Sequence, residues 1–225
     1  MTGDSRIRHS HAEEAQVVAD ELERAKKEAA NGLVQAARVR EMVMSAIERG
    51  AFKLRPSTIL ELNRCAIEGL DPYAGNWRPA SVKIGQSKHE PPDGHLVAGL
   101  VEEMCDYVNN HWEARTSVHL ASLIMWRLNW IHPFTDGNGR TSRATSYLVL
   151  CAKSGAVFPG KETIPEQIVA NRAPYYDALE AADSRHTETG GFPEDVVVAM
   201  EKIMGGMLAR QLTDMYAGAI GVHPV

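Results

Sequence analysis

The spacing of apolar residues predicts two helices in the first fifty residues. From His11 to about Arg49 the chain is rich in Ala, Glu, Lys, Arg, Leu and Val and contains no proline. Asn31-Gly32 interrupts this segment, and a glycine inside a helix costs about 1 kcal/mol relative to alanine. We therefore expect one helix to end and another to begin at this pair. The apolar positions near helical spacing are Val17, Leu22, Ala25, Leu33, Ala36, Val39 and Val43.

Proline and glycine mark the next boundaries. Arg55-Pro56-Ser57-Thr58 is typical of a helix start with a hydroxyl N-cap, and Glu61 is placed as its capping-box partner. This helix is expected to run toward Gly69. Residues 70–92 combine prolines and glycines with short alternating stretches, which indicates a loop with one small β-hairpin.

The segment Ser117–Trp130 is apolar on almost every side, as a central buried helix should be. A further helix is expected to start near residue 137 and to end before Gly155. Pro165 opens a short helix, Pro174 opens the next one, and a last helix starts at about Glu194. We find no internal repeat. The predicted fold class is all-α, a helical bundle with one small β-hairpin.

These elements divide the chain into four parts. We expect a disordered leader at 1–10, a helical segment at 11–50, a main domain at 51–210 and a C-terminal tail at 211–225. A chain of 225 residues is long enough for one good core and a small appendage.

Composition and charge exclude several classes of protein. The net charge of −5 gives no reason to expect nucleic acid and argues against a generic DNA binder, while a local basic patch stays compatible with it. No stretch approaches the roughly 20 apolar residues of a membrane span, so we expect no membrane partner. The N-terminus is charged and lacks an apolar signal region, which favours a cytoplasmic protein. The three scattered cysteines are expected to be reduced thiols.

Residues 132–143 gather the groups needed to move a phosphate-bearing group. His132 can accept a proton near neutral pH, and Asp136 can hold Mg²⁺ through its oxygens, although it is also placed as a helix N-cap. Gly137, Asn138 and Gly139 would open a helix whose N–H groups face an anion. Arg140 and Arg143 lie three positions apart, on one helix face, with side chains suited to phosphate oxygens. A nucleotide site is therefore predicted.

The same run resembles the signature of the Fic (filamentation induced by cAMP) family, H-P-F-x-(D/E)-G-N-G-R-x-x-R, at every specified position. The resemblance extends from about Ile59 to Asp183 and implies that residues 51–210 form a Fic domain. It implies transfer of AMP from ATP, with Mg²⁺, to a Ser, Thr or Tyr hydroxyl of a target protein, and release of pyrophosphate. Doc-like relatives transfer a phosphate instead and have lysine where this chain has Gly139.

Two alternatives to AMP transfer remain open. Another nucleotide, such as UMP or GMP, could be transferred, because the signature contacts phosphates rather than bases. A non-catalytic interaction partner in a toxin–antitoxin-type system is a second alternative. A homo-oligomer is compatible with the sequence.

The resemblance also implies a flap beside the active site, at which an extended target segment adds to a strand edge. The predicted flap residues are Val82, Lys83, Ile84, Gly85, Gln86, Ser87 and His89.

Many members of the family carry an inhibitory helix with the motif (S/T)-x-x-x-E-(G/N), whose glutamate pairs with the second signature arginine. The closest N-terminal stretch is Lys26–Asn31, where lysine and alanine replace the hydroxyl and the glutamate. The hypothesis is that the chain is constitutively competent, or that a separate inhibitory protein restrains it.

Overall fold

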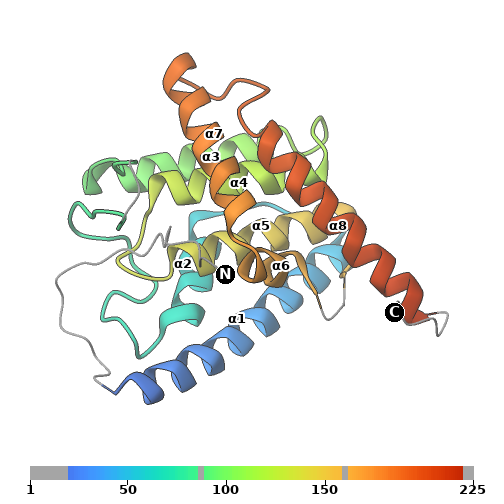
Figure 1. Ribbon diagram of the computed structural model, residues 1–225, viewed down its shortest axis with the longest axis horizontal. Coiled ribbons are helices and arrows are strands. Elements are labelled where there is room, and N and C mark those ends of the chain that lie inside the picture. Colours follow the sequence, from blue (N-terminus) through green and yellow to red (C-terminus); the bar gives the residue numbers. More distant parts are fainter. Residues whose placement is uncertain (1–19, 86–88, 159–161, 220–225) are drawn as a thin grey trace.

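The predicted all-α class is confirmed by a computed structural model, which describes residues 20–85, 89–158 and 162–219 (Figure 1). No residue in these ranges belongs to a β-strand. The helices are α1 (Glu21–Arg49), α2 (Pro56–Ile67), the short 3₁₀ helix η1 (Gly94–Leu96), α3 (Val97–Asn110), α4 (Ser117–Ile131), α5 (Asn138–Ser154), α6 (Ile164–Ala170), α7 (Ala173–Thr189) and α8 (Val198–Ala219).

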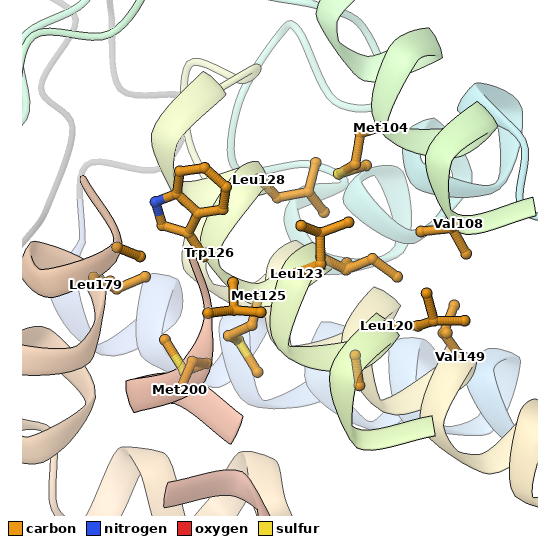
Figure 2. Close-up of a cluster of buried hydrophobic side chains, with 14 of the residues drawn as sticks. Met104, Val108, Leu120, Leu123, Met125, Trp126, Leu128, Val149, Leu179 and Met200 are labelled. Carbon is orange, nitrogen blue, oxygen red and sulfur yellow. The ribbon is translucent and has the colours of Figure 1, made fainter. Parts of the chain in front are cut away.

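Helix α4 is the centre of the bundle. It packs against α3, α5, α7 and α8, and most of its residues are buried, as its apolar sequence predicts. Figure 2 shows Leu120, Leu123 and Trp126 of this helix pointing into a cluster that also includes Met104, Val149 and Leu179. Full burial of one such side chain contributes about 1.5–3 kcal/mol. This packing fixes the C-terminal end of α4, where the signature residues begin.

Helix α1 corrects the expected break at Asn31-Gly32. It is continuous from Glu21 to Arg49 and lies along one edge of the molecule, against α2 and α5 (Figure 1). The Asn31 side chain is buried, and its amide nitrogen donates to the carbonyls of Ala66 and Glu68, at 3.3 and 3.0 Å. The Asn31 side chain therefore satisfies the C-terminal end of α2, and these bonds offset the low helix propensity of the Asn-Gly pair.

The predicted hairpin is not seen. Of residues 82–85 and 89, only Ile84 has a β-bridge, and it is buried. Gln86 and Ser87 lie outside the described residues, as do the leader at 1–10 and the end of the tail. Helix α8 runs through residue 211, the expected start of the tail, to Ala219.

The three cysteines are free thiols, as expected. Burial raises the pKa of Cys105 to about 12 and that of Cys151 to about 11. In the described parts of the chain, no helix has both the length and the apolar character needed to span a membrane.

Replacing Asn31 tests the anchor of α1. Asn31→Ala removes two side-chain hydrogen bonds and leaves buried carbonyls of α2 without them, so we expect a loss of about 1–3 kcal/mol in the free energy of unfolding. Urea denaturation measures this loss. Asn110→Ala, at an exposed position of α3, is the matched control and should change stability by less than about 0.5 kcal/mol. Equal stability of the two variants would contradict the anchoring role.

Candidate active site

A tight connection between two buried helices holds the signature residues. Helix α4 ends at Ile131 with His132 as its C-cap, and α5 begins at Asn138 with Gly137 as its N-cap. Both cap residues are left-handed, with φ of 50° at His132 and 76° at Gly137. His132 is the one described non-glycine residue with positive φ. This conformation costs about 1–2 kcal/mol for an L-residue, so the surroundings must impose it.

Arg78 is the main support of the His132 backbone. Its buried guanidinium donates from Nε to the His132 carbonyl at 2.8 Å, and its backbone N–H donates to the Pro133 carbonyl at 2.9 Å. Its other nitrogens reach the carbonyls of Ala80, at 2.7 Å, and Pro92. Burial lowers the pKa of Arg78. One side chain therefore joins both ends of the segment 80–92 to the loop 132–137.

Two buried asparagines form hydrogen bonds with the backbone in the rest of the connection between α4 and α5. The Asn138 side chain accepts from Phe134 N–H and donates to Phe134 C=O, both at 2.9 Å. Any contribution of Asn138 to phosphate binding is therefore confined to its backbone N–H. Asn63 of α2 donates to the Asp136 carbonyl at 3.1 Å and accepts from Gly75 N–H at 3.0 Å. Phe134 is buried, which agrees with a role as an anchor of the loop.

The start of α5 has the features of an anion site. No side-chain hydrogen bond caps this helix, and an uncapped helix start, with its unpaired N–H groups and the positive end of its dipole, favours an anion. Arg140 and Arg143 follow in the first two turns. Burial is the main cause that lowers the pKa of Arg143. None of the ion pairs among the described residues involves Arg143.

Asp136 lies beside this helix start. Its Oδ1 accepts from Gly137 N–H, and its Oδ2 accepts from Arg140 at 3.0 Å and from Arg24 of α1 at 3.2 Å. Since Gly137 is the N-cap of α5, the alternative that Asp136 serves as the N-cap is not the one observed.

The described residues contain no cluster of three protein ligands for a metal. One carboxylate next to a phosphate site nevertheless fits Mg²⁺, which commonly binds one or two carboxylates together with substrate phosphates.

His132 itself is only 3% exposed. Any group that approaches the imidazole must therefore first displace the side chains that bury it. Of the predicted flap residues, Val82, Lys83, Ile84 and Gly85 lie in the segment that Arg78 ties to the loop. His89 donates from Nε2 to the carbonyl of Trp130 at 2.7 Å, two residues before His132.

The structure thus brings His132, Asp136, Gly137–Gly139, Arg140 and Arg143 together in one loop and helix. Sequence reasoning assigned no role to Arg78, Asn63 or Arg24. The sequence signal for Arg78 was the run Pro72–Arg78, which resembles the P-x-A-G-x-x-R turn of the Fic family. Asn63 and Arg24 have no local signal, because their partners lie 73 and 112 residues away.

Part of the chain is similar in sequence to known proteins. Residues 53–150 match the Fic/DOC family. The chain is 35% identical over 127 residues to the protein adenylyltransferase Fic of Drosophila willistoni, covering 56% of this chain and 24% of that protein. It is 32% identical over 149 residues to the protein adenylyltransferase fic-1 of Caenorhabditis briggsae, covering 65% and 28%. The chain therefore spans about a quarter of the length of these curated relatives.

Solved structures share the fold. A Fic-domain-containing signalling protein from Bacteroides thetaiotaomicron superposes with a TM-score of 0.70 at 22% identity, covering 86% of this chain and 73% of that one. Fic-1 from Caenorhabditis elegans superposes with a TM-score of 0.60 at 22% identity, covering 89% and 55%.

Glycine at position 137 is required for two separable reasons, which makes it a test of the connection. A Cβ there would lie 2.7 Å from Ile67 Cγ2, and φ is positive, whereas at Gly155 φ is also positive but no atom lies within 4 Å. Both alanine variants incur the conformational cost, and Gly137→Ala adds overpacking of about 1–3 kcal/mol. Thermal or urea unfolding should show this extra loss. If Gly155→Ala were equally destabilising, the close approach of α2 to the loop would be refuted.

Proposed function

We propose, from the match of residues 53–150 to the Fic/DOC family, that the chain is a protein adenylyltransferase. It transfers AMP from ATP to a Ser, Thr or Tyr hydroxyl of a target protein and releases pyrophosphate. The observation that carries this proposal is the convergence of His132, Asp136 and an uncapped α5 start with two arginines in one supported loop. The names of the sequence relatives, protein adenylyltransferases, support the same activity.

The residues divide the reaction between them. The hydroxyl oxygen of the target attacks the α-phosphorus, His132 accepts the hydroxyl proton, and the bond from the α-phosphorus to the bridging oxygen breaks. Pyrophosphate leaves with the electron pair of that bond. The N–H groups at the start of α5 face the α- and β-phosphates, and Arg143 faces the γ-phosphate.

Asp136 would hold Mg²⁺, which when bound neutralises phosphate charge and favours departure of pyrophosphate. Gly139 favours attack at the α-phosphate, because Doc-like phosphate transfer is associated with lysine at this position. Positioning of the reactants can supply about 7–11 kcal/mol of the rate enhancement. A single donor to a developing anion typically supplies about 3–4 kcal/mol.

The acceptor is proposed to be a protein that presents a hydroxyl side chain in an extended segment. The segment 82–89 is the proposed place of contact, because Arg78 and His89 tie it to the catalytic loop. A cytoplasmic location, a separate inhibitory protein and a homo-oligomer stay predictions from the sequence.

The role of His132 is tested by a variant that keeps the left-handed backbone. Asparagine tolerates positive φ but cannot serve as a base near neutral pH, so His132→Asn should lose about 100-fold or more of the transfer rate. The measurement is incorporation of α-³²P-labelled ATP, UTP or GTP into lysate proteins, followed by mass spectrometry of the adduct. His95→Asn, at an exposed position of η1, is the matched control.

The outcomes separate the alternatives. Labelling by ATP that depends on His132 supports adenylyl transfer, and labelling by UTP or GTP would replace AMP with another nucleotide. Equal labelling by His132→Asn would remove His132 as the base. A complete absence of labelling with all three nucleotides would favour a non-catalytic partner.

A further inference from the structure

Four charged side chains form a closed ring between α1 and the start of α5. Arg24 contacts Glu28 at 3.3 Å and Asp136 at 3.2 Å, and Arg140 contacts Asp136 at 3.0 Å and Glu28 at 3.6 Å. Asp136 Oδ2 and Glu28 Oε1 each lie between the two arginines, so positive and negative groups alternate around the ring. Arg24 and Glu28 are one helical turn apart on α1, which places both on the face toward α5.

The ring occupies the groups that the proposed reaction needs. Asp136 is the carboxylate proposed for Mg²⁺, and Arg24 places a positive charge on it. Arg140 is proposed to contact the triphosphate, and Glu28 places a negative charge beside it. Arg24 thus carries a positive charge, as the metal ion does, and Glu28 carries a negative charge, as a phosphate does.

We propose that Arg24 and Glu28 form a charge-matched latch that occupies the cation and phosphate positions until a metal–nucleotide complex displaces both. This inference rests on the proposed function, since it assigns a regulation to the same site. It gives the first turns of α1 an inhibitory role in cis that acts through the metal carboxylate.

The anchoring of α1 allows this latch to open locally. Its buried residues are Asn31, Gln35, Val39, Val43 and Ala46, and none precedes Asn31. Residues 21–30 contact the signature through the ring, whose four side chains remain 25–39% exposed. Exposed ion pairs are weak. A divalent ion and a triphosphate can therefore displace the first turns while the rest of α1 stays packed on α2.

The latch differs from the inhibitory motif described for the family. In that motif a glutamate pairs with the second signature arginine, which is Arg143 in this chain. Here Glu28 contacts the first one, Arg140, and Ala30 stands at the position of the motif glutamate. The contact of Arg24 with Asp136 also has no counterpart in that motif.

Nucleotide affinity tests the latch. Arg24→Gln removes both ion pairs of Arg24, so a larger fraction of molecules is open. Calorimetric titration with Mg²⁺ and a non-hydrolysable ATP analogue should give about two- to tenfold tighter binding. The control is Lys26→Gln, which also removes one positive charge and an ion pair from α1, with Glu23 at 2.8 Å, without touching the signature. Equal affinities of the two variants, or weaker binding by Arg24→Gln, would overturn the proposal.

Hydrogen exchange tests the latch without nucleotide. Asp136→Asn removes the negative charge that holds Arg24, so backbone amides of residues 21–30 should exchange several-fold faster, while those of 35–49 stay unchanged. Unchanged exchange at 21–30 would refute the latch even if nucleotide binds. If wild type and Arg24→Gln both fail to bind the analogue, the proposed function fails, and the exchange rates alone decide the latch.

Discussion

Between α4 and α5 the chain must turn within six residues, 132–137, and both ends of the turn adopt left-handed backbone. Glycine accepts this conformation at Gly137, but at His132 the surrounding structure must enforce it. The carbonyl of His132 receives the buried guanidinium of Arg78, and Asn63 and Asn138 satisfy the backbone of the rest of the loop. Each of these polar groups is costly to bury alone. Together they hold the loop 132–137 in one geometry, which the apolar packing of α4 could not specify.

Much of the fold follows from local patterns. The apolar run of α4, the proline at the start of α2 and the signature at the start of α5 each predict an element that the structure contains. The break expected at Asn31 was wrong because a tertiary contact, with carbonyls 35 and 37 residues away, decides that position. The expected hairpin was wrong for residues 82–85, where Ile84 is buried and no strand forms.

In the candidate site, too, some features follow from local sequence patterns and others from tertiary contacts. Its signature residues are contiguous, so the sequence alone brings them together, and the helix that follows them orients the two arginines. The side chains that contact the signature residues, Arg78 and Arg24, come from distant segments. Arg78 is 54 residues from His132, and Arg24 is 112 residues from Asp136. No spacing rule connects such residues, because their contact depends on how α1 and α2 pack against α5. The contacts of Arg78 and Arg24 with the signature are therefore visible only in the folded chain.

The central claim is that the start of α5 binds a nucleotide triphosphate with a metal ion on Asp136. A crystal structure with Mg²⁺ and a non-hydrolysable ATP analogue tests it most directly. The account predicts a metal ion about 2.1 Å from an Asp136 oxygen, phosphates at the N–H groups of α5, and the His132 imidazole facing the α-phosphorus. A nucleotide bound elsewhere, with Asp136 still paired to Arg24, would contradict the account.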